Sequence, residues 1–325
     1  MSAEKLTILK GKAEVPLSGL TDKKVLLIGY GNQGRSHALN LRDSGIEVVV
    51  STRDTNKATA DEFKVVPNSE ATSSDLIIIA LPDEIQGDFF QTELLPHLNS
   101  NTVLGFIHGF SIRYEHINPP LGIGVVMVAP KGPGITVRQR YLENTGVPAL
   151  LAVERENTTN TARSIALAWA AGIGSGRTAV IESTFADETE TDLFGEQAII
   201  VGGLAALVRA AYETLVDAGY PPELAYIECC HEVKQVADIL HEKGMSEMMA
   251  AISNTAEMGA YEAMDLLDDE HLRSHFRTIL QGVRDGSFAK RLVNHSIPSK
   301  REELANHEID KIGKEIRSLM HPKTD

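Results

Sequence analysis

Two pairs of acidic residues in this chain share a spacing that suits metal binding. Asp192 and Glu196 stand four residues apart, and Glu228 and Glu232 repeat that spacing further along the chain. Residues four apart lie on one face of a helix, where like charges repel each other unless a cation lies beside them. Carboxylate oxygens are hard ligands that favour Mg²⁺ or Mn²⁺ over Zn²⁺. The four residues therefore predict a divalent metal site, with an ordinary solvated helix face as the alternative for each pair.

The residues that follow the first pair strengthen the metal interpretation. Residues 198–201 and 204–208 are apolar, so this helix is predicted to have little solvated surface. Carboxylates at the mouth of such a helix are partly removed from water, and a desolvated carboxylate must either take up a proton or find a cation.

A glycine-rich turn near the N-terminus predicts a dinucleotide site. Residues 24–28 are predicted to form a buried strand, the sequence Gly-Tyr-Gly-Asn-Gln-Gly follows at 29–34, and a helix at 35–42 leads to a second strand at 46–50. In a strand-turn-helix unit this spacing lets the backbone approach a pyrophosphate at the helix N-terminus. The expected cofactor contacts are Tyr30, Gly31, Asn32 and Gln33.

The end of the second predicted strand bears on which dinucleotide is bound. An acidic residue there favours the ribose hydroxyls of NADH, whereas basic and hydroxyl residues favour the 2′-phosphate of NADPH. Arg53 and Lys57, among hydroxyl residues, favour NADPH, and Asp54 keeps NADH open.

Further predicted strands at 75–80, 102–106 and 123–128 each end in residues that can do chemistry. Ligands of open α/β sheets bind at the carboxyl ends of the strands, so these residues should line one crevice. The residues are Asp83, Glu84, Ile85 and Gln86 after the first strand, His108 after the second, and Lys131 and Gly134 after the third.

The rest of the chain predicts two domains. A strand at 148–153, a helix at about 160–171 and a strand at 179–181 complete a Rossmann-like, doubly wound α/β sheet, and helical periodicity alone continues from Phe185. We therefore expect a dinucleotide-binding domain at 1–184 and an all-helical domain at 185–325 for metal, substrate and dimerisation.

Composition narrows the function classes. The 325 residues carry a net charge of −14 with 42% hydrophobic residues, which makes nucleic acid and anionic membrane surfaces improbable partners. The N-terminus has no apolar segment of signal-peptide type, and two adjacent cysteines offer no disulfide framework, so a cytoplasmic location is expected.

Motifs along nearly the whole chain resemble one enzyme family. They are GYGNQG, LPDEIQ, HGF, VMVAPKGPG, DETETDLFGEQ, ETLVDAGYPPELAYIECCHE, ISNTAE and IDKIGKEIRSLM. The chain resembles ketol-acid reductoisomerase (acetohydroxy acid isomeroreductase), in the short form with one knotted helical domain. The resemblance implies Mg²⁺-dependent alkyl migration in 2-acetolactate or 2-aceto-2-hydroxybutyrate, followed by NADPH reduction, in branched-chain amino acid biosynthesis.

The resemblance also implies residue roles. Asp192 and Glu196 would hold two Mg²⁺ ions together with Glu228 and Glu232 of the partner subunit, in a homodimer or a higher assembly of dimers. Lys131 and His108 match catalytic positions, and Ser253 matches a serine that contacts a 2-hydroxy-3-keto acid substrate. Either a carboxylate such as Glu232 or a water held by Lys131 would carry the proton.

Some positions differ from the family pattern. Asn32 and Arg35 replace the usual serine and histidine beside the phosphates, and residues 258–265 differ from the usual sequence after ISNTAE. Three alternatives therefore stay open: a paralogue acting on a related 2-hydroxy-3-keto acid, a metal-free β-hydroxyacid dehydrogenase, and a catalytically silent nucleotide-binding module.

Overall fold

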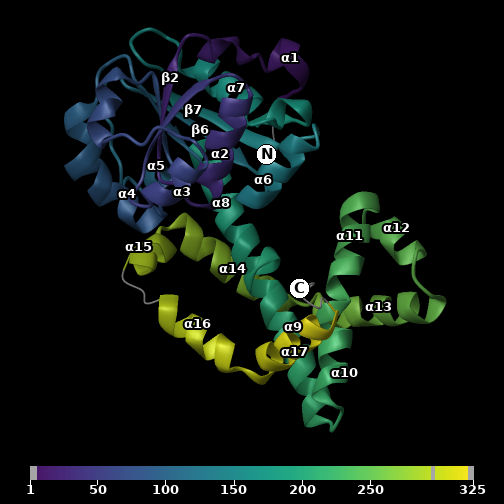
Figure 1. Cartoon of the computed structure of the whole chain (residues 1–325). Helices are drawn as coiled ribbons and strands as arrows, with labels where there is room; N and C mark the ends of the chain where they lie inside the picture. Colours follow the sequence, from purple (N-terminus) through teal and green to yellow (C-terminus); the bar gives the residue numbers. More distant parts are fainter. Residues whose placement is uncertain (1–5, 294–296, 321–325) are drawn as a thin grey trace. The chain divides into compact units, whose positions relative to one another are not determined.

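The computed structural model describes residues 6–293 and 297–320. The chain divides into two compact units, with the division after Thr191 (Figure 1). The predicted domain boundary near Thr184 lies just before helix α8 (Phe185–Gly195), which continues across this division.

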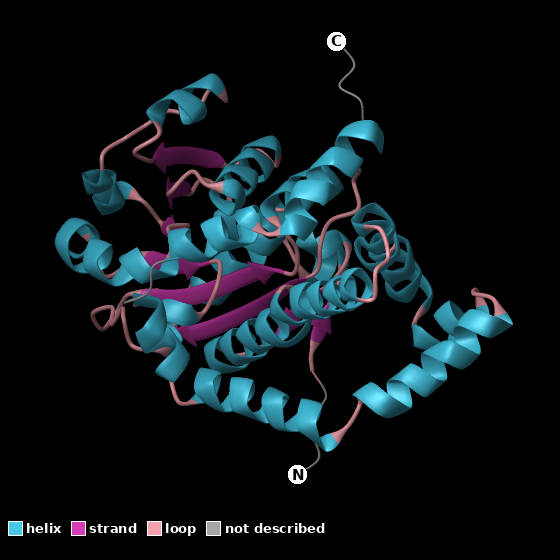
Figure 2. Ribbon diagram, turned by 90° about the horizontal axis from the view of Figure 1, so that it is seen from below, coloured by secondary structure: helices cyan, strands magenta, loops and turns pink. Residues whose placement is uncertain are grey.

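The first unit is built on an eight-stranded mixed sheet, with helices on both of its faces (Figure 2). The strand order is β1-β8-β7-β6-β5-β4-β2-β3, and the strands from β6 to β3 run parallel. β7 is antiparallel to β6, and β1 is antiparallel to β8. The strands are β1 Ile8–Leu9, β2 Lys24–Ile28, β3 Glu47–Ser51, β4 Leu76–Ile79, β5 Val103–Phe106, β6 Gly124–Pro130, β7 Ala149–Arg155 and β8 Val180–Glu182.

Most of this sheet was predictable from the sequence. Each predicted strand is present with its ends shifted by at most two residues, whereas β1 is additional. The helices are α1 Gly11–Glu14, α2 Asn32–Asp43, α3 Thr55–Ala60, α4 Asp83–Phe89, α5 Phe110–Arg113, α6 Gly134–Leu142 and α7 Ala162–Gly172. The Rossmann-like fold class is confirmed, and the sheet is mixed rather than purely parallel because β7 reverses direction.

The core of the first unit lies on both faces of the sheet, since alternate strand residues point to opposite faces. Along β2, Val25 and Leu27 join one apolar cluster, and Leu26 and Ile28 join the other. Trp169 of α7 is fully buried in the first cluster. Both faces are therefore filled by residues of this one unit.

The described part of the second unit is helical, as predicted. Its helices are α9 Gly202–Asp217, α10 Pro222–Tyr226, α11 Val233–Lys243, α12 Met245–Ala250, α13 Asn254–Leu267, α14 Glu270–Arg284, α15 Ser287–Val293, α16 Ile297–Asn306 and α17 Glu308–Met320. One wide π turn at Glu196–Ile200 separates α8 from α9, and a second at Ile227–His231 separates α10 from α11.

The prediction that the apolar helix has little solvated surface is wrong for the single chain. Ile199 is 57% exposed and Leu207 is 61% exposed. One buried cluster in the described part of this unit consists of Tyr212, Ala225, Tyr226 and Ile316, and neither of the two exposed residues belongs to it. The stretch Phe185–Asp217 is also long and apolar enough to cross a membrane. This is weak evidence for a membrane span, because core helices of soluble proteins can have the same length and composition.

Candidate functional site

A buried carboxylate, Glu188, lies at the centre of a cluster of polar groups in the first unit. Its side chain is only 1% exposed. The Lys131 ammonium donates to Glu188 Oε1 at 2.7 Å, the Gly109 amide donates to Oε2 at 3.0 Å, and His108 Nδ1 lies 3.0 Å from Oε2. Glu188 therefore holds the two candidate catalytic residues, Lys131 and His108, on one carboxylate.

The sheet brings these residues together. β5 and β6 are neighbouring parallel strands, so His108 and Lys131 follow them at the same edge. Glu188 lies in the first turn of α8, where the helix dipole favours a negative charge. Phe185 of the same turn is buried and packs edge-to-face against Phe106 of β5.

Close approach of α8 requires a glycine after His108. A Cβ atom at Gly109 would lie 2.4 Å from the Thr189 hydroxyl oxygen and 2.8 Å from the Phe185 carbonyl oxygen. Real Cβ atoms do not approach other atoms so closely, and therefore any larger residue here would push α8 away from His108.

The charges around Glu188 decide its ionisation. Burial by itself would raise the pKa of this carboxyl group. The hydrogen bond and charge of His108, with the charge and hydrogen bond of Lys131, outweigh burial and lower the pKa to about 2. Glu188 is therefore a carboxylate at neutral pH, and it presents a fixed negative charge to Lys131 and His108.

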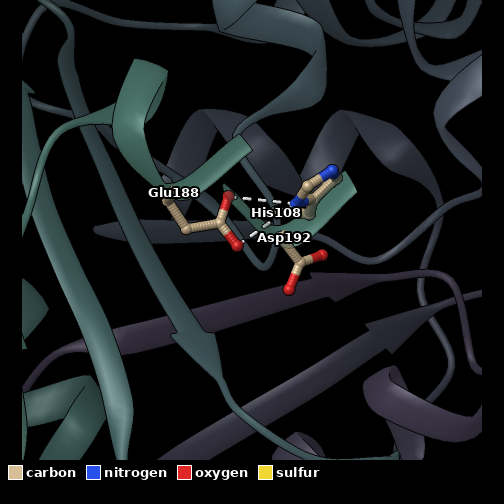
Figure 3. Close-up of side chains that lie close together, drawn as sticks. All are labelled: His108, Glu188 and Asp192. Atoms are coloured by element: carbon tan, nitrogen blue, oxygen red, sulfur yellow. Dashed lines mark hydrogen bonds and ion pairs between the residues drawn. The ribbon is translucent and has the colours of Figure 1, made fainter. Parts of the chain in front are cut away.

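One predicted metal ligand lies beside this cluster. Asp192 follows Glu188 by one turn of α8, and candidate ligand atoms of His108, Glu188 and Asp192 lie within 4.8 Å of one another (Figure 3). Asp192 therefore places a further carboxylate beside this cluster, and carboxylate oxygens are ligands that suit a hard cation.

The four predicted metal carboxylates do not gather within one chain. Among the described residues, the group that includes Asp192 contains none of Glu196, Glu228 and Glu232. Both pairs adjoin the two π turns, which close through hydrogen bonds from the Val201 amide to the Glu196 carbonyl and from the Glu232 amide to the Ile227 carbonyl. Wide turns of this kind are frequent at functional sites.

The predicted phosphate turn has the glycine geometry that a dinucleotide requires. Gly29 has φ +95°, and a Cβ atom there would lie 2.6 Å from the Ala80 carbonyl oxygen. A Cβ at Gly34 would lie 2.2 Å from the Gly29 carbonyl oxygen. A Cβ at Gly31 would meet no atom within 4 Å, so that face of the turn is open for a ligand.

A cavity of about 780 Å³ opens beside this turn, at the carboxyl ends of the strands. Seven predicted cofactor contacts line it, and His108 lines it as well. The seven are Tyr30, Gly31, Gln33, Arg53, Asp83, Ile85 and Gln86. Asn32 faces a separate cavity with Arg35 and Lys57, Gly134 is buried against the backbone of Asn32, and Glu84 lines neither cavity.

Several of these side chains already form hydrogen bonds within the protein, Tyr30 and Gln86 among them. The Tyr30 hydroxyl donates to Asp61 at 2.9 Å, and Arg35 donates to the same carboxylate at 2.6 and 2.8 Å. Gln86 donates to the Leu81 carbonyl and accepts from the Ser111 hydroxyl. Tyr30 and Gln86 therefore shape the cavity wall, and their contact with a cofactor stays a prediction.

The predicted substrate residue lies in the second unit. Ser253 is the N-cap of α13, and its hydroxyl oxygen accepts from the Ala256 amide at 3.2 Å. Ser253 is exposed, like Glu228 and Glu232. Capping accounts for the serine locally, and its contact with substrate stays a prediction.

Sequence reasoning missed Glu188. Its position was readable, because Glu188 precedes Asp192 by four residues and so extends the acidic face to three members. What the sequence did not indicate was that the first member is buried and paired with Lys131 and His108.

Comparison with known proteins places both parts of the chain in one family. Residues 19–179 match the family model described as acetohydroxy acid isomeroreductase, NADPH-binding domain. Residues 185–322 match the model described as ketol-acid reductoisomerase, C-terminal domain. The structure of an NADH-preferring ketol-acid reductoisomerase from an uncultured archaeon superposes with a TM-score of 0.92 at 38% identity, covering 96% of this chain and 99% of that one.

More distant structures share the fold alone. A putative oxidoreductase from Jannaschia sp. CCS1 has a TM-score of 0.61 at 13% identity, over 81% of this chain and 97% of that one. A semialdehyde dehydrogenase NAD-binding protein from Cupriavidus necator, solved with calcium and NAD, has a TM-score of 0.61 at 20% identity, over 81% of this chain and 99% of that one. Both family models and the 38% identical structure agree, and this chain therefore belongs to the ketol-acid reductoisomerase family of NAD(P)H-dependent enzymes.

Proposed function

We propose that this protein isomerises 2-acetolactate or 2-aceto-2-hydroxybutyrate in a Mg²⁺-dependent step and then reduces the product to the 2,3-dihydroxy acid. This is a cytoplasmic reaction of valine and isoleucine biosynthesis. The observation that carries the proposal is the cluster of Lys131, His108 and Glu188, with Asp192 one turn further along α8 and His108 lining the cofactor cavity.

The cluster handles protons and orients the substrate. Lys131 presents N–H donors to substrate oxygens, and the ionised Glu188 keeps a negative charge beside its ammonium. His108 is held through Nδ1 by the same carboxylate, which fixes the direction of its ring.

The oxygen-rich donor set fits Mg²⁺. Asp192 and Glu196 would hold two ions with Glu228 and Glu232 of the partner subunit. When bound, the ions act as Lewis acids on the substrate carbonyl and hydroxyl oxygens. Proton transfer would fall to Glu232 or to a water held by Lys131, and Ser253 would contact the substrate carboxylate.

Exposed apolar side chains of the π turn Glu196–Ile200 and of α9 support a homodimer, or a higher assembly of dimers. Ile199, Leu204 and Leu207 are each at least 43% exposed, and an apolar face of this kind is usually covered by another subunit. The net charge of −14 gives no basis for a nucleic acid partner or an anionic membrane surface.

We propose NADPH as the preferred cofactor, with NADH as the alternative. Arg53 lines the cofactor cavity with an exposed side chain, and Lys57 is exposed in the first turn and a half of α3. The Asp54 carboxylate accepts from the Lys57 amide as the N-cap of α3. The positive charges of Arg53 and Lys57, with Asp54 already accepting a hydrogen bond, favour the 2′-phosphate of NADPH. The 38% identical relative is NADH-preferring, so the choice needs a direct measurement.

The first experiment follows oxidation of NADPH, and in parallel NADH, by the purified protein given 2-acetolactate and Mg²⁺. Turnover that excess EDTA stops and added Mg²⁺ restores is the expected result. Cofactor binding without turnover of either substrate would reject the proposed reaction.

Glu196→Gln tests the metal role. The substitution removes one charged ligand and leaves the phosphate turn unchanged, so we expect isomerisation to fall by at least about a hundredfold with cofactor affinity unchanged. Single-turnover product analysis measures the isomerisation rate, and fluorescence titration measures the affinity for the cofactor. Glu242→Gln, an exposed acidic residue of α11, is the matched control. Normal isomerisation by Glu196→Gln would remove this residue from the metal site.

Arg53→Glu tests cofactor choice. A carboxylate at this position repels a 2′-phosphate, so the Kd for NADPH should rise about tenfold or more while that for NADH changes little. Fluorescence titration with both cofactors measures the ratio, and Arg140→Glu, on the exposed face of α6, controls for net charge. Equal losses for both cofactors would show that Arg53 does not contact the phosphate.

A further inference from the structure

One side chain joins the phosphate turn to the loop that carries Lys131. Gln33 lies at the second position of α2 and lines the cofactor cavity. Its Nε2 donates to the Gly132 carbonyl at 2.9 Å, across 99 residues of sequence. Gly132 is the residue after Lys131, so this hydrogen bond ties the candidate catalytic loop to the cofactor turn.

Packing makes this connection stiff. Residues 131–133 lie between β6 and α6, and the Lys131 amide donates to the Pro148 carbonyl at 2.8 Å. At the start of α6, a Cβ atom on Gly134 would lie 2.3 Å from the Asn32 carbonyl oxygen. The buried Ser36 hydroxyl donates to the Gly134 carbonyl at 2.7 Å. The first turns of α2 and α6 are therefore in backbone contact, and the Lys131 loop has little room to move independently.

The cost of this arrangement indicates that Gln33 is not there for stability. Its other amide atom, Oε1, is buried without a hydrogen-bond partner in the described structure. An unpaired buried acceptor destabilises a fold, and an apolar side chain of the same shape avoids that penalty. Gln33 therefore forms one hydrogen bond, to the Gly132 carbonyl, while its buried Oε1 atom has no hydrogen-bond partner in the described structure.

We propose that Gln33 is a positioning residue, which transmits cofactor occupancy at the phosphate turn to the Lys131 loop through the Gly132 carbonyl. The inference rests on the proposed function for the role of Lys131. Phosphate binding at the N-terminus of α2 fixes the backbone of Gln33, and its side chain then fixes Gly132 and the direction of Lys131 towards Glu188.

Gln33→Met is the decisive variant, because methionine keeps the length and removes both polar atoms. We expect the Tm to be unchanged or higher, since the unpaired Oε1 is gone, while kcat falls about tenfold to a hundredfold through misplacement of Lys131. The KM for the 2-hydroxy-3-keto acid substrate should change less than kcat. Gln139→Met, an exposed glutamine of α6 that bonds only to Glu143 among the described residues, is the matched control.

A second measurement does not depend on turnover. Hydrogen exchange followed by mass spectrometry, with and without NADPH or NADH, reports protection of peptides that cover residues 129–137. In the unmodified protein the cofactor should slow exchange in this loop as well as at 30–36. In Gln33→Met it should slow exchange at 30–36 alone.

The outcomes separate this inference from the proposed function. A lower Tm for Gln33→Met with an unchanged kcat, or cofactor protection of 129–137 that persists in the variant, would overturn the positioning role. If the unmodified protein shows no turnover of 2-acetolactate, the proposed function fails, and the exchange experiment still decides whether Gln33 couples the cofactor turn to the loop.

Discussion

The two units of this chain differ in how far their apolar side chains are buried. In the first unit, the strands β2, β4, β5 and β6 are almost entirely buried, and two apolar clusters fill both faces of the sheet. In the second unit, α9 has many apolar side chains, yet Leu204 and Leu207 are 43% and 61% exposed. The first unit closes its core with its own residues, whereas the second leaves these apolar side chains exposed in the single chain.

The comparison separates what each unit needs in order to work. The cofactor cavity and the Lys131, His108 and Glu188 cluster are built from first-unit residues alone. Glu228, Glu232 and Ser253 lie exposed in the second unit. Cofactor binding should therefore survive damage that abolishes the metal-dependent step.

The largest expected effect comes from placing charge on α9. Leu204→Arg combined with Leu207→Arg should give a species with the mass of one chain and abolish turnover, because a buried unpaired charge costs several kcal/mol at an interface. Cofactor binding should persist. Light scattering coupled to gel filtration measures the mass, and Leu121→Arg, at an 89% exposed residue of the first unit, is the control. A doubly substituted protein that keeps its original mass would show that α9 is not an interface.

A smaller effect is expected in the core of the first unit. Trp169 is fully buried, so Trp169→Ala should lower the free energy of unfolding by about 3–5 kcal/mol. Tyr220→Ala, at a 53% exposed aromatic residue of the second unit, should change it by less than about 0.5 kcal/mol. Urea titration followed by circular dichroism suits both, since Trp169 is the chain's single tryptophan. Similar losses at the two sites would contradict the comparison.

The effect that is smallest per pH unit is a pH dependence of the first unit. His37 is fully buried, its Nδ1 accepts from the Trp169 indole at 3.0 Å, and burial lowers its pKa from 6.5 to about 3. The unfolded chain therefore takes up the proton first as pH falls. Stability should decrease below pH 6.5 towards pH 3 by up to about 1.4 kcal/mol per pH unit, with no contribution above 6.5.

His37→Gln isolates this contribution, because glutamine still accepts from the indole but does not titrate in this range. The difference in unfolding free energy between the two proteins should shrink or reverse in favour of the variant between pH 6.5 and 4. Urea titrations at several pH values measure it. A constant difference across that range would mean that His37 is already protonated in the folded protein, or not buried.

The strongly patterned parts of the fold were predictable from the sequence. Residues 24–28, 75–80 and 102–106 are mostly apolar runs with a glycine, proline or polar residue within the next two positions, and each forms a largely buried strand. β1 was not predicted, because the two residues Ile8 and Leu9 are too short a run to show any period. The antiparallel direction of β7 was also not predicted, because an apolar run does not indicate the direction of its strand in the sheet.

The site was predictable in its residue types but not in its connections. His108, Lys131 and Asp192 were expected as functional residues, and their ligand or hydrogen-bonding atoms meet at or beside Glu188. The pairing with Glu188 depends on the approach of α8 to Gly109, a tertiary contact that no local pattern encodes.

The π turn that begins at Glu196 was also not predicted, because it too depends on contacts that the local pattern does not show. Gly202 and Gly203 permit it, because a Cβ atom on either would lie within 2.3 Å of a backbone carbonyl oxygen of the preceding turn.

The division after Thr191 also has a consequence for how the protein is made. The first unit contains its whole core in the part of the chain that leaves the ribosome first, so it can fold while the second is still being translated. At about 5–20 residues per second, residues 192–325 take roughly 7 to 27 seconds to synthesise. If α9 is completed by a second copy, the last step of maturation is an encounter between chains, with a rate that depends on their concentration. Low expression would then produce molecules that bind the cofactor before they acquire catalysis.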